Sequence, residues 1–263
     1  MALYLHCISI LLSLWLLPPS VHPKKSIAGL TVMEPVNQKC IGNILFLNGW
    51  NMKTEEVCRQ SELCSLALQK GYRLLFPEMG KSVYASAYYQ ETRSDYRKHK
   101  SIQWLSDTLL PQLKSQNIFF EKGANNHIMG LSTGARGAVL LASRLPDCFR
   151  SLVLLSGDYN QCIDTSDWLM INTYGRFYQH PERWKTIDNP LQASSSLRCN
   201  VFIAHGVKDK LVNAEHSFLL EKKLKQNETM KLYFVQSWYP DSAGHDWKFW
   251  RAGIEKGIAF ITN

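Results

Sequence analysis

The fold is decided by residues 127–142, His127-Ile-Met-Gly-Leu-Ser-Thr-Gly-Ala-Arg-Gly-Ala-Val-Leu-Leu-Ala142. In this stretch an apolar run is interrupted by Gly-x-Ser-x-Gly and is followed at once by small and aliphatic residues. The pattern predicts a strand, a very tight turn and a helix. In such a turn the serine takes a positive φ, and strand and helix pass so closely that only residues without a bulky side chain fit two positions before and after it. Gly130 and Gly134 occupy those two positions.

A strand, tight turn and helix of this kind form the nucleophile elbow of the α/β-hydrolase fold. Ser132 is therefore the candidate nucleophile, with its hydroxyl lifted above the edge of the sheet. The backbone amide of Thr133, the first of the helix, is expected to stabilise an oxyanion. A motif this short also occurs by chance, so the alternative is a glycine-rich turn with a buried serine. The partners of Ser132 elsewhere in the chain decide between the two interpretations.

The composition indicates one globular domain. The chain has 263 residues, of which 45% are hydrophobic and 20% charged, and it contains no repeat or low-complexity segment. The formal net charge is +8, but the basic residues are scattered and no nucleic-acid-binding motif accompanies them. We therefore expect a solvated basic surface and no nucleic-acid partner.

Residues 1–22 resemble a targeting segment. The run 2–18 is apolar and uncharged and is too short to span a bilayer comfortably, which favours a signal peptide. Export to the periplasm or the exterior is the expectation, with an α/β-hydrolase domain over residues 27–263. An uncleaved anchor, which alone would place the protein at a membrane, and a buried N-terminal helix are the alternatives.

Six cysteines follow the targeting segment: Cys40, Cys58, Cys64, Cys148, Cys162 and Cys199. An even number in an exported chain permits disulfides, although six cysteines allow 15 pairings. Buried free thiols are the alternative. No Cys-x-x-Cys pair or histidine-rich cluster suggests a metal, and no cofactor is expected.

Apolar runs and helical patterns alternate along the chain. The predicted strands cover residues 30–33, 44–47, 73–76, 127–131, 152–155, 201–204 and 232–235. The predicted helices cover residues 55–70, 102–113, 133–144 and 214–225, with a last helix after residue 246. This alternation predicts an α/β fold with a mostly parallel central sheet flanked by helices, and functional sites then lie at the carboxyl ends of the strands.

Three segments leave the carboxyl ends of strands on the way to the site. The loop Asn48-Gly49-Trp50-Asn51 is expected to supply the second oxyanion amide, from Trp50 or otherwise from Asn51. Residues 77–95 are predicted to form either a wall of the site or a surface loop. Residues 159–191 are irregular and rich in aromatic residues, which predicts a small cap over the site; the alternative is that the aromatic residues only pack the insertion against the core.

Asp209 and His245 are the predicted partners of Ser132. Asp209 follows the strand 201–204, and His245 lies in the loop between the last strand and the last helix. The chain order serine, aspartate, histidine is that of α/β-hydrolases. Imidazole takes the proton that makes a serine hydroxyl nucleophilic, and the carboxylate orients the imidazole. Asp158 is the alternative acid, and His205 is expected to bond the loop backbone. The other histidines are not candidates for the base, and His99, His180 and His216 are predicted at the surface.

The chain resembles the esterase D group of α/β-hydrolases, which includes S-formylglutathione hydrolases, feruloyl-type esterases and secreted mycolyltransferases. The resemblance covers residues 44–261. It rests on Gly-Leu-Ser-Thr-Gly-Ala at 130–135, Pro-Glu-Met-Gly-Lys-Ser-Val-Tyr at 77–84 and Gly-His-Asp-Trp-x-x-Trp at 244–250. It implies Ser132 as nucleophile, Asp209 as acid and His245 as base, with the amides of Trp50 and Thr133 as the oxyanion hole.

These observations predict a serine carboxylesterase that cleaves a small-molecule or acyl ester through an acyl-enzyme intermediate. A thioesterase or acyltransferase would use the same three side chains, and a peptidase would need a larger amine-binding site. A non-enzymatic protein that binds a ligand or partner would keep the same architecture. Substrate identity and oligomeric state stay open at this point.

Overall fold

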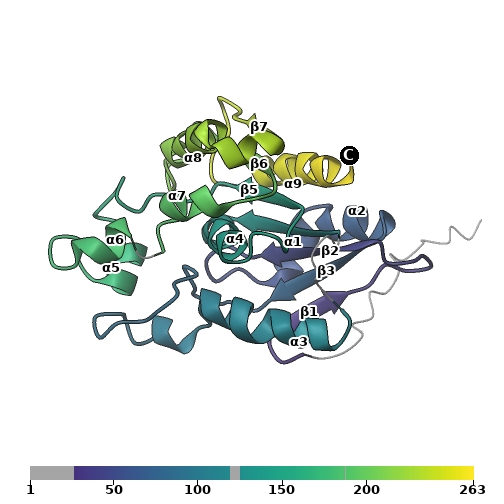
Figure 1. Ribbon diagram of the computed structural model, residues 1–263, viewed down its shortest axis with the longest axis horizontal. Helices are drawn as coiled ribbons and strands as arrows, with labels where there is room; N and C mark the ends of the chain where they lie inside the picture. Colours follow the sequence, from purple (N-terminus) through teal and green to yellow (C-terminus); the bar gives the residue numbers. More distant parts are fainter. Residues whose placement is uncertain (1–26, 119–124, 187) are drawn as a thin grey trace, which may run out of the picture.

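The computed structural model describes residues 27–118, 125–186 and 188–263, so the predicted signal peptide and Cys7 lie outside the described residues. Within them the chain forms a seven-stranded sheet of order β1-β3-β2-β4-β5-β6-β7 (Figure 1). β1 is antiparallel to β3, and the other neighbours are parallel. The strands are β1 (Leu30–Met33), β2 (Gly42–Leu47), β3 (Tyr72–Pro77), β4 (Asn126–Leu131), β5 (Ser151–Leu155), β6 (Asn200–Ala204) and β7 (Val235–Trp238).

The central strands are apolar on both faces because helices cover both sides of the sheet. Every residue of β2, β4 and β5 is buried, whereas burial alternates along the edge strand β1. The mostly parallel sheet flanked by helices, predicted from the alternation of patterns, is confirmed. The carboxyl ends of the parallel strands β2, β4, β5 and β6 therefore lie at one edge of the sheet, as the sequence predicts.

Two apolar layers hold the helices on the sheet. One contains side chains of α3 (Leu110–Ser115), α4 (Thr133–Arg144) and α8 (Glu215–Gln226). The other contains side chains of α1 (Thr54–Gln60), α2 (Leu63–Gln69) and α9 (Trp247–Thr262). The nucleophile elbow lies at the junction of β4 and α4, in the middle of the sheet, so both layers support it.

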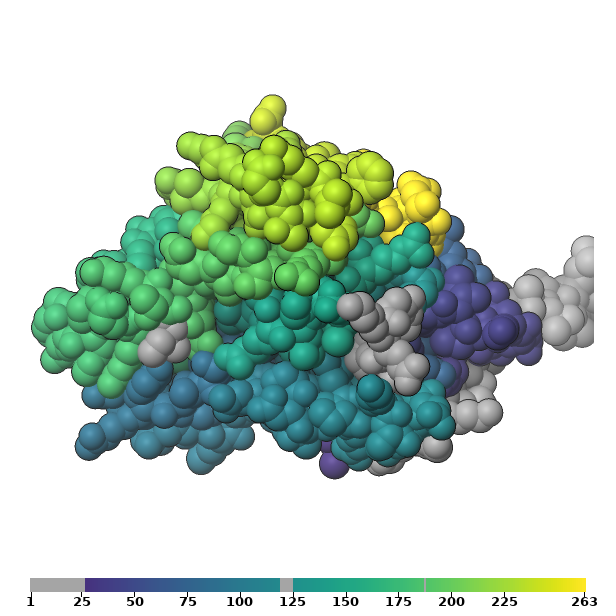
Figure 2. All heavy atoms as spheres, viewed as in Figure 1, coloured from purple at the N-terminus to yellow at the C-terminus, as the bar shows by residue number. Residues whose placement is uncertain are grey.

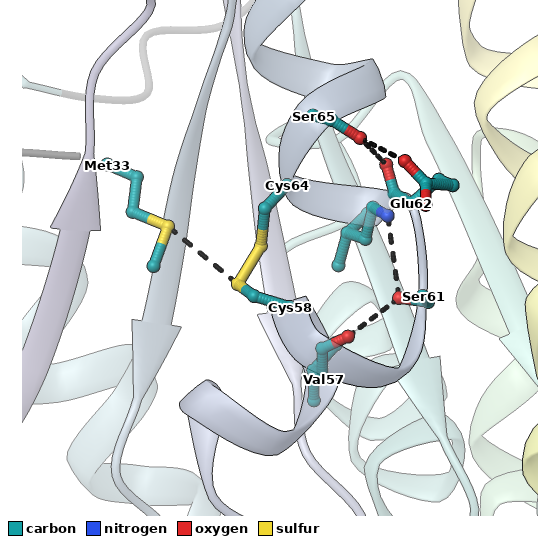
Figure 3. Close-up of a disulfide and its surroundings, with 8 residues drawn as sticks. Met33, Val57, Cys58, Ser61, Glu62, Cys64 and Ser65 are labelled. Carbon is teal, nitrogen blue, oxygen red and sulfur yellow. Dashed lines mark hydrogen bonds between the residues drawn. A yellow bond between two sulfur atoms is a disulfide. The ribbon is translucent and has the colours of Figure 1, made fainter. Parts of the chain in front are cut away.

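The helix predicted over residues 55–70 is in fact two helices, α1 and α2. Ser61 ends α1 by bonding through its hydroxyl to the Val57 carbonyl, and the same oxygen accepts the amide of Leu63. Figure 3 shows the disulfide between Cys58 and Cys64, which closes this corner. A short side-chain oxygen that competes for backbone groups breaks a helix even where the apolar pattern continues. The other cysteines in the described part of the chain, Cys40, Cys148, Cys162 and Cys199, are free thiols.

The strand predicted at residues 232–235 is wrong by three residues. Residues Glu228–Leu232 form a 3₁₀ turn, and β7 begins only at Val235, which pairs with Val201 of β6. Leu232 and Phe234 are 84% and 76% exposed. Their apolar character indicates a strand, but no layer of the fold covers them, so pattern alone misplaced the strand.

The helix predicted over residues 102–113 begins as a π-helical segment, η2 (Trp104–Leu109), and continues as α3. Pro111 stands in the first turn of α3. Because proline has no amide proton and its ring crowds the preceding turn, the regular hydrogen-bond ladder cannot run through this point. The wider turns upstream accommodate the proline, which explains the departure from a continuous α-helix.

Among the described residues of 159–191 lie the short helices α5 (Trp168–Tyr174) and α6 (Pro181–Lys185), and α7 (Pro190–Ala193) begins at the end of this range. Figures 1 and 2 show α5 and α6 at the left end of the molecule, beside the segment around residues 85–100. The amide of Arg93 donates to Asn172 O at 2.8 Å and Thr92 Oγ1 to Thr173 O at 2.6 Å. Within the described residues, no helix is long and apolar enough to cross a membrane.

Candidate active site

The elbow places the Ser132 hydroxyl at the carboxyl edge of the sheet. Ser132 has φ 55° and ψ −123°, and its amide donates to Leu155 O of the neighbouring strand at 2.8 Å. A Cβ on Gly130 would overlap the backbone of Gly134, and a Cβ on Gly134 would overlap the backbone of Leu47. The two glycines are therefore what allows β4 and α4 to meet at so sharp an angle.

The three predicted side chains come together at this edge. His245 Nε2 lies 3.1 Å from Ser132 Oγ, and His245 Nδ1 lies 2.6 Å from Asp209 Oδ2. Ser132 comes from the elbow, Asp209 from the loop after β6, and His245 from the loop between β7 and α9. One imidazole thus contacts the hydroxyl with one ring nitrogen and the carboxylate with the other.

The Asp209 carboxylate is held by four groups. Its Oδ1 accepts the amides of Leu211 and Val212 at 2.9 and 2.8 Å, and its Oδ2 faces both His245 and His205. Burial acts to raise the pKa of this carboxyl, but hydrogen bonds with the two histidines outweigh it and hold the pKa well below its ordinary value. Asp209 is therefore ionised and fixed in direction.

Two backbone amides are candidates for binding an oxyanion. Thr133 is the first residue of α4, so its amide has no acceptor within the helix. The amide of Trp50 donates to no group in the described part of the chain. The amide of Asn51 instead donates to Gly80 O at 2.9 Å, which removes the alternative named from sequence.

A cavity of about 520 Å³ opens beside Ser132. Its walls include Trp50 and Met52 from the loop after β2, Trp168 and Met170 from α5, and Leu211 and Val212 from the Asp209 loop. Trp168 lines the cavity, whereas Tyr174 and Trp184 are buried in the packing of the insertion. Some aromatic residues of residues 159–191 therefore face the site, and others only pack the insertion. Among the described residues, no three His, Cys, Asp or Glu side chains gather as a metal site.

Comparison with known proteins identifies the family of the chain. The family described as Putative esterase matches residues 47–261. The chain belongs to this family. The esterase is also similar to the fluorophosphonate-binding serine hydrolase FphF of Staphylococcus aureus, with 18% identity, coverage of 89% of this chain and 92% of that one, and a TM-score of 0.68.

Two further proteins are similar to the esterase. An S-formylglutathione hydrolase of Agrobacterium tumefaciens has 16% identity, coverage of 88% of both chains and a TM-score of 0.66. The uncharacterized peptidase YtmA of Bacillus subtilis (strain 168) is 29% identical over 127 residues, which is 45% of this chain and about half (47%) of that protein. The α/β-hydrolase fold and the resemblance to the esterase D group are confirmed, and membership of the esterase family supports an ester-hydrolysing enzyme.

The alternative acid, Asp158, is engaged elsewhere in the esterase. Its Oδ2 accepts Arg136 Nη1 at 3.0 Å, and Arg136 is fully buried beneath the elbow. Burial raises the pKa of Asp158 to about 6 despite this partner. The structure therefore brings Asp209, and not Asp158, against His245.

Sequence reasoning missed a contact of His205. Its Nε2 lies 2.9 Å from Val212 O, as expected for a residue that bonds the loop backbone, but also 3.3 Å from Asp209 Oδ2. Its Nδ1 lies 2.7 Å from Ser217 Oγ. The spacing of His205 and Asp209 in His-Gly-x-x-Asp was the available signal, because four residues across a tight loop bring two side chains together.

The prediction of His216 at the surface is wrong. His216 is buried, and its Nδ1 accepts the amides of Tyr159 and Asn160 at 3.0 and 3.1 Å. A nitrogen that accepts two amides carries no proton. Burial lowers the pKa of His216 to about 4. His216 therefore holds the chain at the exit of β5 as a neutral side chain.

We expect the esterase to lose stability as the pH falls below about 6.5. The unfolded chain takes up a proton on His216 near pH 6.5, whereas the folded chain resists it until about pH 4, so unfolding becomes easier with acid. The contribution between pH 6.5 and 5 is roughly 2 kcal/mol. Urea unfolding at pH 6.5 and 5 measures this change in the free energy of unfolding. The variant His216→Gln can still accept an amide but does not titrate, so its free energy of unfolding should lack the part of the pH dependence that comes from His216. An unchanged pH dependence in His216→Gln would contradict the assignment.

Proposed function

We propose that the protein is a serine carboxylesterase that cleaves its ester through an acyl-enzyme, with Ser132 as nucleophile, His245 as base and Asp209 as the acid that orients it. The observation that carries the proposal is the position of one imidazole between hydroxyl and carboxylate, at 3.1 and 2.6 Å. Nucleophile and base within hydrogen-bond reach, and a base oriented by a third group, are the requirements of this chemistry.

In the first half-reaction Ser132 Oγ bonds to the ester carbonyl carbon while its proton passes to His245 Nε2. The carbonyl π pair moves to the oxygen, and the amides of Thr133 and Trp50 stabilise that oxyanion. When the carbonyl reforms, the bond to the alcohol oxygen breaks and His245 returns the proton to the leaving alcohol. The acyl group is left on Ser132.

In the second half-reaction a water molecule takes the place of the alcohol. His245 removes one proton from the water as its oxygen bonds to the acyl carbon, and the same two amides hold the second oxyanion. Collapse of this intermediate breaks the bond to Ser132 Oγ, which takes the proton back from His245 and releases the carboxylic acid. The ionised Asp209 stabilises the imidazolium in both halves.

The cavity supports a small-molecule ester with an apolar portion as the substrate. About 520 Å³ is in the range of small-molecule sites, and Trp50, Trp168 and Leu211 provide apolar walls. Trp50 and Trp168 meet edge to face, with ring centroids 6.1 Å apart, across the loop after β2 and α5. We place the apolar part of the substrate against these rings.

We further propose that the esterase is exported. The apolar segment 2–18 supports this, and so does the disulfide between Cys58 and Cys64, because disulfides form and persist in oxidising compartments. Mass spectrometry of the protein secreted by its host would locate the mature N-terminus. A chain retained in the cytoplasm with residues 1–22 intact would contradict export.

A fluorophosphonate probe tests the catalytic assignment without knowledge of the substrate. The phosphorus atom is attacked by an activated serine, so we expect stoichiometric labelling, and digestion should place the label on the peptide that contains Ser132. Denatured protein is the control and should take up no label. A folded protein that stays unlabelled, or one labelled at another serine, would overturn the proposal.

A further inference from the structure

Two hydrogen bonds bracket the loop that carries the Trp50 amide, and both come from residues 80–84. The Tyr84 hydroxyl donates to Asn48 O at 2.8 Å, and the amide of Asn51 donates to Gly80 O at 2.9 Å. Between them lies the peptide that joins Gly49 to Trp50. A segment that follows β3 therefore contacts the loop after β2 on both sides of its candidate oxyanion donor.

We propose that Tyr84 is a positioning residue of this esterase, whose hydroxyl holds the loop after β2 so that the Trp50 amide points at the oxyanion. The inference rests on the proposed function, because it assigns a role within that reaction. Tyr84 does not line the cavity and acts through the backbone of Asn48.

The geometry of the loop explains why one hydroxyl matters. Gly49 O accepts the amide of Met52 at 3.1 Å, which fixes one side of the peptide whose other side is the Trp50 N–H. The preceding peptide is fixed by the bond from Tyr84 to Asn48 O. Only the φ and ψ of Gly49 lie between these two peptides, and glycine is the residue that resists rotation least. Without the Tyr84 bond, the direction of the Trp50 amide depends on that glycine.

Tyr84 is itself held rigidly. The side chain is fully buried, and the backbone has a positive φ of 59° that the amide stabilises by donating to Ser82 Oγ at 2.9 Å. The neighbouring carbonyl of Val83 accepts Arg136 Nε of α4 at 3.0 Å. Burial raises the pKa of the Tyr84 phenol far above its ordinary value, so the hydroxyl keeps its proton and donates.

The same ring packs on the helix that carries the other oxyanion amide. A Cβ on Gly137 of α4 would overlap the Tyr84 ring, so the glycine makes room for it. Tyr84 thus contacts α4, which begins with Thr133, and bonds to the loop that contains Trp50. One side chain sets the spacing between the two amides that the proposed reaction uses.

The test is Tyr84→Phe, which removes one oxygen and keeps the ring. We expect kcat for p-nitrophenyl butyrate to fall about 10-fold, since the donor is displaced rather than deleted, with KM changed less than about twofold. The inhibition constant of a trifluoromethyl ketone, which forms a tetrahedral oxyanion on the serine, should rise by the same factor as kcat falls. The pH profile of kcat/KM should stay in place, because His245 and Asp209 are untouched.

Tyr88→Phe is the matched control. The Tyr88 hydroxyl donates to a backbone carbonyl in the same segment, His99 O at 2.7 Å, but has no bond to the loop after β2. We expect this variant to lose stability without the loss in kcat. Thermal unfolding of both variants separates folding from catalysis.

The outcomes distinguish this inference from the proposed function. Wild-type protein that hydrolyses the ester, together with a Tyr84→Phe variant within twofold of it in kcat and in ketone affinity, overturns the inference alone. A loss confined to KM, or an equal loss in Tyr88→Phe, overturns it as well. Wild-type protein that neither hydrolyses the ester nor takes up the fluorophosphonate overturns the proposed function, and the inference with it.

Discussion

Replacing Ser132 by alanine should lower kcat for p-nitrophenyl butyrate by about 10⁵- to 10⁶-fold. The oxygen of this hydroxyl bonds to the acyl carbon in the proposed reaction, and His245 Nε2 lies 3.1 Å from it. What activity remains comes from the oxyanion amides and from substrate binding. Steady-state kinetics with p-nitrophenol release measures the loss, and fluorophosphonate labelling should vanish with it.

The double variant Ser132→Ala, His245→Ala is the control for this result. If the two side chains act as one unit, the second substitution costs almost nothing once the first is made, because a base without a nucleophile has no proton to take. A further loss of about tenfold or more in the double variant would mean that His245 acts independently of Ser132. Retention of esterase activity by folded Ser132→Ala would remove the nucleophile assignment altogether.

Replacing Asp209 by asparagine should lower kcat by about 10⁴-fold. The carboxylate accepts a hydrogen bond from His245 Nδ1 at 2.6 Å, which leaves Nε2 free to take the proton of Ser132. An asparagine amide can donate to Nδ1 instead, and the ring then carries its proton on Nε2 and cannot act as a base. Because the ratio of the two neutral tautomers does not depend on pH, steady-state kinetics should show this loss across the pH range in which the wild type is active.

Asp158→Asn is the matched comparison for Asp209→Asn. Both carboxylates follow core strands, but Asp158 bonds to Arg136 and Asp209 bonds to His245. We expect Asp158→Asn to change stability and KM, since Asp158 also lines the cavity, and to leave kcat far above that of Asp209→Asn. A larger loss of kcat in Asp158→Asn would reverse the assignment of the acid.

Much of the site could be predicted because its parts have local requirements. A serine in a strained turn needs small residues such as Gly130 and Gly134 two positions before and after it, so five consecutive residues are enough to recognise the turn. Asp209 and His245 could be named because residues that directly follow parallel strands all lie at one edge of the sheet. The strand order brings the loops that carry them to the same edge, and the folding of those loops sets the distances between the side chains.

The contacts that support the site could not be predicted in the same way. Tyr84 and His216 each bond to a backbone group that lies on another loop, and only the packing of the chain brings the partners together. A histidine whose ring nitrogen accepts two buried amides looks, in sequence, like any polar residue on a helix. For that reason the sequence predicts His216 at the surface, although it is buried.

By itself the sequence determined the elbow, the chain order of the proposed nucleophile, acid and base, and the sheet at whose edge they lie, because steric limits on backbone torsions and the burial of apolar runs act over short stretches. Tertiary structure alone decided which amide is free to face an oxyanion. The sequence names the amide of Trp50 first and that of Asn51 as the alternative, and only the approach of Gly80, from another loop, satisfies Asn51 and leaves Trp50 without an acceptor among the described residues.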